Sequence, residues 1–138
     1  MSLDTWLTEF YPIPAYDITN EEDALLHSLQ KWKGLLAVNL KRHKLKRYKT
    51  KIWDYPDNNL DGESHDFHIN MDTCALCYIH CFSGYGGGCK YCSLARVRRK
   101  GDRYVACDHQ IGHIDVSPYN EYTEYGNPKP MLRWLRAA

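Results

Sequence analysis

Two Cys-x-x-Cys pairs, Cys74/Cys77 and Cys89/Cys92, are separated by only eleven residues. One Cys-x-x-Cys step lets a tight turn aim two thiolates at a single ion, and a second pair completes a tetrahedron. Four of the six residues from 83 to 88 are glycines, which adopt positive φ readily and allow the segment to reverse direction. The spacing therefore predicts a structural zinc site whose ligands are Cys74, Cys77, Cys89 and Cys92.

Further potential ligands keep the ligand set open; they are His80, Cys81, Cys107, His109 and His113. The last two stand four residues apart and would form, with Cys89 and Cys92, a mixed set slightly longer than the usual histidine-containing finger. An iron–sulfur cluster shares the all-thiolate ligation, and buried reduced thiols without a metal are a third alternative. Cys81 fits the last description best. A zinc ion with four protein ligands has no open position for water, so an all-cysteine site stabilises the fold without doing chemistry.

The composition is that of a globular protein. The 138 residues fit one domain, and 43% of them are hydrophobic and 25% charged. No apolar run approaches the roughly 18 residues of a membrane span. The first residues lack the basic and apolar regions of a secretory signal, so we expect a cytosolic protein with no membrane partner. Cytosolic thiols stay reduced, which favours metal ligation over disulfides for the paired cysteines.

The charge is segregated although the net charge is only +1. Residues 1–30 hold six acidic side chains, residues 31–51 hold nine Lys or Arg, and residues 52–72 return to six acids. A second group of six cations lies between residues 90 and 103. Such blocks can bind polyanions, but they can equally neutralise one another within the fold.

Two basic patches are the candidates for binding nucleic acid or an acidic partner protein. The first patch contains Lys41, Arg42, Lys44, Lys46 and Arg47, and the second contains Arg96, Arg98, Arg99 and Lys100. Cations on one surface can contact phosphates and so make binding salt-dependent. The alternative for the first patch is structural, because a helix that begins with acids and ends with lysines is matched to its own dipole.

A zinc-supported nuclease of the HNH type is the alternative function. Asp108-His109 resembles the Asp-His step of such enzymes, in which the histidine activates water. The expected asparagine and second histidine are not evident at their spacing. The sequence therefore favours a non-enzymatic protein and leaves His109, with Asp108, as the alternative catalytic pair.

Local patterns predict an α+β fold for a single domain, residues 1–138. Thr19-Asn20-Glu21-Glu22 is typical of a capping box, and the apolar spacing that follows predicts a long helix over residues 20–45, which Gly34 could split. Residues 66–70 alternate like a strand within a zinc and hairpin region, 66–107, and residues 95–106 suggest a hairpin. Two short helices are expected over 117–137, one capped by Ser117 and closed by Gly126, the other capped by Asn127.

Taken together, the motifs resemble a group of small proteins encoded in phage and prophage genomes. The resemblance covers roughly residues 20–138 and rests on Ala24–His27 with Lys31–Leu35, Asn39-Leu40-x2-His43, Cys74-Ala75-Leu76-Cys77, Cys89-x2-Cys92-Ser93-Leu94, and Ser117-Pro118-Tyr119 with Pro130-Met131. The group usually has Pro where this chain has Ser93. Its further cysteine is matched by Cys107, which implies that Cys107 can replace one of the four ligands. The resemblance implies no activity, but it implies a host-cytosol protein that binds a host factor or nucleic acid.

Overall fold

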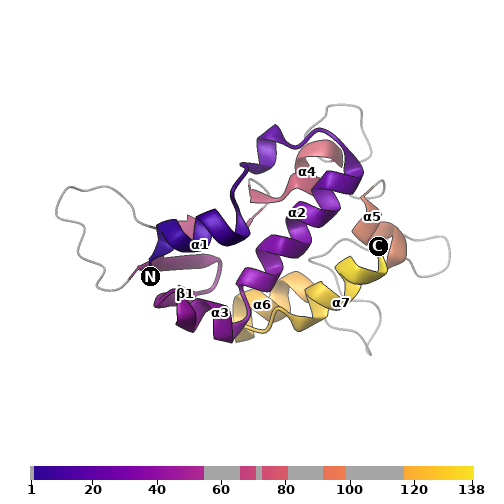
Figure 1. Ribbon diagram of the computed structural model, residues 1–138. Coiled ribbons are helices and arrows are strands. Elements are labelled where there is room, and N and C mark those ends of the chain that lie inside the picture. The colour runs from indigo at the N-terminus through magenta and orange to yellow at the C-terminus, as the bar shows by residue number, and fades with distance from the viewer. Residues whose placement is uncertain (1, 55–65, 71–72, 81–91, 99–116) are drawn as a thin grey trace.

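The computed structural model describes residues 2–54, 66–70, 73–80, 92–98 and 117–138 and confirms an α+β fold (Figure 1). The helices are α1 (Leu3–Phe10), the 3-10 turn η1 (Ala15–Asp17), α2 (Glu21–Gly34), α3 (Ala37–Arg42), α4 (Ala75–His80), α5 (Ser93–Val97), α6 (Pro118–Tyr125) and α7 (Lys129–Ala137). The strands are β1 (Leu45–Tyr48), β2 (Lys51–Asp54) and β3 (Asp66–His68), and they form one antiparallel sheet in that order.

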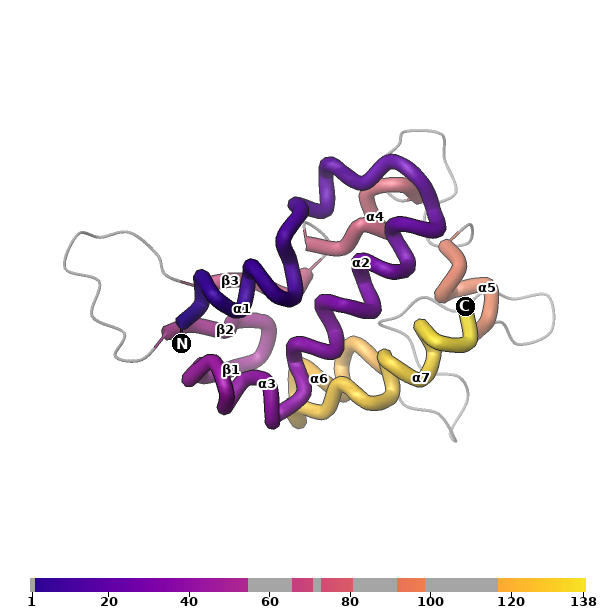
Figure 2. The backbone as a smooth tube through the Cα atoms, in the orientation of Figure 1, coloured from indigo at the N-terminus to yellow at the C-terminus, as the bar shows by residue number. Residues whose placement is uncertain are grey.

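The 14-residue helix α2 runs through the middle of the molecule, and α1, α4 and α7 pack against it (Figures 1 and 2). The sheet lies beside α1 at one end, whereas α5 and the C-terminal end of α7 lie at the other. No helix in the described part of the chain is long and apolar enough to cross a membrane.

The long helix expected over residues 20–45 is divided in two, and the chain continues into β1. Asn20 begins α2, because its side chain accepts a 2.8 Å hydrogen bond from the Asp23 N–H; Thr19 does not cap the helix as expected. The helix ends at Gly34, whose carbonyl accepts a 2.8 Å hydrogen bond from the Trp6 indole. That bond satisfies one of the carbonyls that a helix end leaves without a partner.

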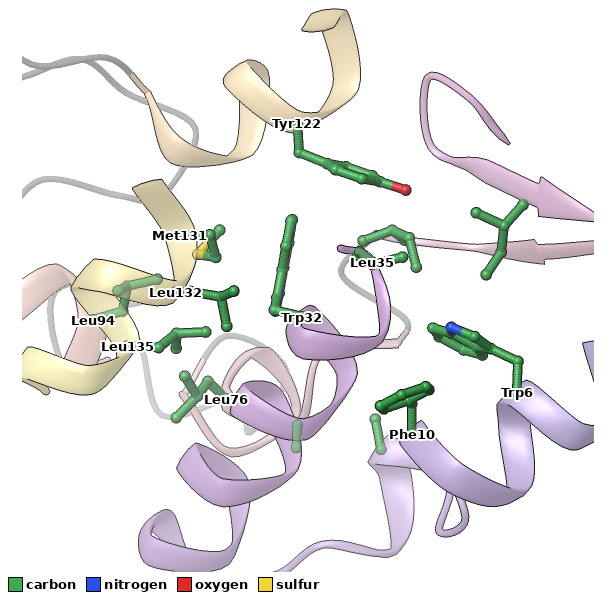
Figure 3. Close-up of a cluster of buried hydrophobic side chains, with 14 of the residues drawn as sticks. Trp6, Phe10, Trp32, Leu35, Leu76, Leu94, Tyr122, Met131, Leu132 and Leu135 are labelled. Carbon is green, nitrogen blue, oxygen red and sulfur yellow. The ribbon is translucent and has the colours of Figure 1, made fainter. Parts of the chain in front are cut away.

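A continuous apolar core joins α1, α2, α4, α5, α6 and α7 (Figure 3). Trp32 of α2 lies at its centre, with its ring 5.2 Å from the Tyr122 ring of α6 and close to Met131 and Leu132 of α7. Trp6 of α1 is fully buried at the end of the core that lies opposite Leu94. The N-terminal helix therefore contributes to the same core as the C-terminal helices.

The register of the sheet separates its side chains into two faces. The inner face, which packs on α1 and α6, consists of Leu45, Arg47, Ile52, Asp54 and Phe67. The outer sheet face consists of Lys46, Tyr48, Lys51, Trp53, Asp66 and His68. Side chains directly opposite in an antiparallel pair point to the same side, so the observed pairs assign each residue to its face. The short strand expected at residues 66–70 is thus confirmed as β3.

The C-terminal helices follow the expected local signals. Ser117 caps α6, Pro118 occupies its first position, and Gly126 closes it in the left-handed conformation at φ 71°. The next helix begins at Lys129, one residue later than expected, and the Asn127 side chain accepts a 3.2 Å hydrogen bond from the Lys129 N–H.

Residues 93–97 form the helix α5, so the first strand of the expected 95–106 hairpin is wrong; residues 99–106 lie outside the described residues. Leu94 and Ala95 are consecutive and both buried. A strand with one solvent face cannot bury two consecutive side chains, because successive residues point to opposite faces. A helical turn buries both between α7 and the core.

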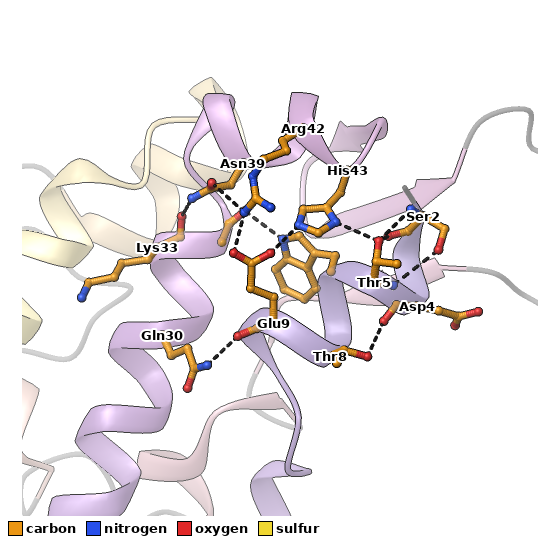
Figure 4. Close-up of polar contacts among 12 residues, drawn as sticks. Ser2, Asp4, Thr5, Thr8, Glu9, Gln30, Lys33, Asn39, Arg42 and His43 are labelled. Atoms are coloured by element: carbon orange, nitrogen blue, oxygen red, sulfur yellow. Dashed lines mark hydrogen bonds and ion pairs between the residues drawn. The ribbon is translucent and has the colours of Figure 1, made fainter.

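A chain of polar contacts fastens α1 to α3 (Figure 4). The buried His43 lies 2.8 Å from the Thr5 hydroxyl through Nδ1 and 2.8 Å from the Glu9 carboxylate through Nε2. Because a carboxylate only accepts, Nε2 donates. Arg42 donates to the other Glu9 oxygen at 2.5 Å, so one carboxylate receives two donors from α3 and its C-cap.

These donors make the stability of the fold depend on the ionisation of Glu9. The Arg42 guanidinium, and then His43, hold the pKa of Glu9 below its usual value of 4.5. A carboxyl whose pKa is lower in the folded state stabilises the fold above its unfolded pKa and loses that contribution as pH falls through the folded value. Wild type should therefore exceed Glu9→Gln in free energy of unfolding at pH 7, and the difference should shrink as the pH falls below the usual carboxyl pKa of 4.5. Urea unfolding at several pH values measures it, and a constant difference would contradict the role of Glu9.

Candidate metal centre and basic surface

Cys74 and Cys77 are brought together where α4 begins. Cys74 immediately precedes the helix, and its carbonyl accepts a 3.1 Å hydrogen bond from the Tyr78 N–H. Cys77 lies in the first turn, and the two side-chain sulfurs are hydrogen-bonded to each other. The Cys-x-x-Cys spacing thus brings two sulfurs together on one helical turn, and a tetrahedral thiolate site needs two such pairs.

The surroundings of Cys74 favour a thiolate. The hydrogen bond from the Cys77 thiol contributes most to lowering the pKa of Cys74 from 9.0 to about 5, and it outweighs the opposing effect of burial. The Lys31 ammonium and the backbone N–H groups of Leu76 and Cys77 act in the same direction. Thiolate is the form in which cysteine binds metals, and N–H groups directed at sulfur are typical outer-shell support for such ligands.

Lys31 supplies the positive charge beside this sulfur from the core face of α2. It is only 1% exposed, and its ammonium donates a 2.8 Å hydrogen bond to the Thr73 carbonyl, next to Cys74. A buried ammonium is costly unless a negative charge or acceptors compensate for the lost water. Four thiolates around Zn²⁺ carry a net charge of −2, so a neighbouring buried cation suits an all-cysteine site.

Cys92 occupies a comparable position, as the residue that caps α5. Its neighbour Ser93 donates a hydrogen bond to the Glu21 carboxylate, and His80 at the end of α4 lies 3.3 Å from the same Glu21 oxygen. Thr73, just before α4, instead contacts Lys31, ten residues further along α2. Cys92 therefore lies toward the end of α4 rather than beside Cys74.

The described residues hold part of the expected ligand set. Among them, no group of three or more Cys, His, Asp or Glu side chains is arranged to bind a metal ion. No disulfide involves the three described cysteines. The remaining expected ligands Cys89, Cys107, His109 and His113, as well as Cys81 and Asp108, lie outside the described residues.

Three of the cations expected to bind a partner serve the fold instead. Arg98 is fully buried, with its guanidinium 5.7 Å from the centre of the Trp134 ring. Arg47 lies on the inner sheet face and donates to the carbonyls of Tyr122 and Thr123 at 3.1 and 3.3 Å. Its guanidinium also packs on Gly126, where any Cβ would come within 2.9 Å of it. Arg42 is exposed but is paired with Glu9.

The remaining cations of the first patch are exposed. We define the α3–β1 surface by Lys41, Lys44, Lys46 and Lys49, all of which are exposed. In the described part of the chain, Lys41 and Lys44 have no carboxylate partner. Arg96 of the second patch is also exposed, on α5, while Arg99 and Lys100 lie outside the described residues. Neutralisation within the fold, the alternative to polyanion binding for these charge blocks, thus accounts for Arg42 but not for Lys41 and Lys44.

Two features of these sites were not expected from the sequence. Lys31 reaches Cys74 only because α4 packs on α2, a contact that no local motif indicates. Tyr48 and Trp53 join the lysines of the outer sheet face only through the pairing of β1 with β2. Their alternation with Arg47 and Ile52 was the available signal, because alternation is typical of a half-buried strand.

Comparisons with protein-family models, with curated proteins and with solved structures find no match to this chain.

Proposed function

We propose that this protein is a non-enzymatic, zinc-stabilised protein that binds nucleic acid through the α3–β1 surface. The observation that carries the proposal is the set of exposed lysines without carboxylate partners at Lys41 and Lys44, beside a sheet and a helix that hold them in place. Such a set attracts phosphates, and each phosphate contact releases counterions from the nucleic acid.

The metal has a structural role in this proposal. The Cys74–Cys77 turn, the low pKa of Cys74 and the buried Lys31 support a thiolate zinc site, with Cys89 and Cys92 or Cys107 as further ligands. Zinc held by four protein ligands lacks an open position, which favours binding over catalysis. A reduced cytosolic environment, which is that of a phage-infected host in the setting suggested by the resemblance, keeps these thiols available for the metal.

Neutralising Lys41 and Lys44 should weaken binding to nucleic acid and reduce its dependence on salt. Each lost phosphate contact lowers the slope of log K against log salt by roughly 0.7 to 0.9, so Lys41→Gln/Lys44→Gln should reduce the slope by about 1.5. The affinity at low salt should fall by about tenfold. Fluorescence anisotropy with a labelled oligonucleotide, repeated at several salt concentrations, measures both quantities.

The matched control is Arg96→Gln/Arg136→Gln, which removes two exposed cations from α5 and α7. It has the same charge change, so it should retain the wild-type slope. If the control loses affinity and Lys41→Gln/Lys44→Gln does not, the binding surface is on α5 and α7 instead. If neither the wild type nor the variants bind any oligonucleotide, nucleic-acid binding is excluded. An acidic protein then becomes the partner to test.

A further inference from the structure

The outer sheet face combines aromatic rings and cations in one plane. Tyr48 is 64% exposed, and Trp53 lies beside it on the neighbouring strand with part of its surface open to solvent. The register pairs Tyr48 with Lys51 and Trp53 with Lys46, so each ring faces a lysine across the sheet. Tyr48 and Trp53 are therefore diagonal neighbours, which lie roughly 7–8 Å apart in an antiparallel pair.

Each of the two rings already has an ammonium group near its face. The Lys51 Nζ lies 4.9 Å from the centre of the Trp53 ring, and the Lys49 Nζ lies 5.6 Å from that of Tyr48. Among the six described side chains of this face Asp66 is the one carboxylate, and it is 3.4 Å from Lys51 and 3.6 Å from His68. The face therefore carries two ammonium groups against one carboxylate, and Lys49 at the adjoining turn adds a third ammonium group.

The inner face has a different role, which leaves the outer face available. Phe67 packs on Trp6 with ring centres 5.5 Å apart, and Asp54 accepts a hydrogen bond from the Leu3 N–H. These contacts fix α1 on the inner side. The hairpin that carries Tyr48 is held from the same side by Arg47, whose guanidinium binds the end of α6. The sheet is thus held in place by contacts on its inner face, and the aromatic side chains of its outer face point away from the core.

We propose that the outer sheet face is a stacking platform for single-stranded nucleic acid. Unpaired bases stack on Tyr48 and Trp53, while Lys46, Lys49 and Lys51 contact the phosphates that run along the strand. Lys51 leaves the Trp53 ring when a base takes its place. Duplex DNA cannot use this platform, because its bases are already stacked on one another. This inference rests on the proposed nucleic-acid binding and adds to it the strand form that is bound.

Removal of one exposed ring should lower the affinity for single strands alone. Alanine substitution of a stacking aromatic typically costs 5- to 100-fold, by order of magnitude, per base. Tyr48→Ala should therefore bind oligo-dT or oligo-U at least about fivefold more weakly, with unchanged binding to heparin, a polyanion without bases. Tyr48→Phe keeps the ring and should behave as wild type. Comparison of oligo-dT with oligo-U shows which sugar is preferred.

The control is Tyr125→Ala, which removes a 78% exposed ring on α6 that is not part of the outer sheet face and should bind single strands as wild type does. If Tyr48→Ala binds single strands as wild type does while Lys41→Gln/Lys44→Gln binds them more weakly, the stacking proposal is wrong. The proposal that the α3–β1 surface binds phosphates then still stands. If the wild type prefers duplex over single strands, the platform is also wrong. If the wild type binds no nucleic acid, both the stacking proposal and the proposed nucleic-acid binding are wrong. If Tyr48→Ala instead turns a dimer into a monomer in analytical ultracentrifugation, the face is occupied by a second copy and the inference is overturned.

Discussion

Cys77→Ser is expected to remove bound zinc and to destabilise the fold together. The Cys77 sulfur is hydrogen-bonded to that of Cys74, so its loss removes one ligand and the main cause of the low pKa of the other. Structural zinc in small domains contributes about 10 kcal/mol or more of binding free energy that is coupled to folding. A loss of even a third of this should lower the melting temperature by roughly 10–15 °C. Elemental analysis and thermal unfolding of the same preparation measure both effects.

The matched control is Cys81→Ser, since Cys81 belongs to neither Cys-x-x-Cys pair. It should keep its zinc and its melting temperature. Cys92→Ser and Cys107→Ser, measured beside it, decide which of these two cysteines completes the site. Full zinc occupancy in Cys77→Ser would overturn the ligand assignment. Bound iron together with visible absorption would show that the site holds an iron–sulfur cluster and not zinc.

Gly34→Ala is expected to destabilise the protein, although helix propensity alone predicts a gain of about 1 kcal/mol. An added Cβ at position 34 would lie 2.5 Å from Phe10 Cγ and 2.8 Å from Phe10 Cβ. Phe10, the last residue of α1, is buried against α2 and has little room to move. Overpacking of this kind costs about 1–3 kcal/mol, so after the propensity gain we expect a net loss of about 1–2 kcal/mol and a melting temperature lower by roughly 3–7 °C.

A double-mutant cycle separates the steric effect from the helix propensity. A Phe10→Ala background removes the Cγ contact at 2.5 Å and keeps the Cβ contact at 2.8 Å, so Gly34→Ala should be less destabilising there than in the wild type. Urea unfolding of the four proteins gives the coupling free energy. An equal effect of Gly34→Ala in both backgrounds would contradict the contact with Phe10 as its cause.

The elements that could be predicted from the sequence depend on local signals. Ser117, Pro118 and Gly126 specify the start and end of α6 within ten residues, and the structure has them in those roles. The β1–β2 hairpin could not be predicted in this way, because Lys49-Thr50 at its turn are not typical turn residues. Lys49 adopts φ 51°, which lysine seldom does without support from the surrounding fold. Helix α1 was missed although Leu3, Trp6, Leu7 and Phe10 have helical spacing.

In the candidate sites, too, the sequence predicts the local arrangements but not those that depend on tertiary packing. Spacing alone was enough to put Cys74 and Cys77 on one turn, because that relation lies within four residues. The roles of Arg47 and Arg98 could not be predicted, since charged side chains are normally exposed and only tertiary packing buries Arg98 and directs Arg47 to the end of α6. Lys31 is the same case in α2, where a helix pattern would assign the ammonium to solvent.

The position of β1 at the edge of the sheet has a consequence for the behaviour of the protein in solution. In the described part of the chain no strand pairs with the outer side of β1, so its backbone donors and acceptors can pair with another chain. The strand has only four residues and carries Lys46, with Lys44 immediately before it and Lys49 immediately after it. Lysines on a short edge strand oppose such pairing by mutual repulsion. The lysines that we assign to nucleic acid therefore also keep separate copies of the sheet from joining edge to edge.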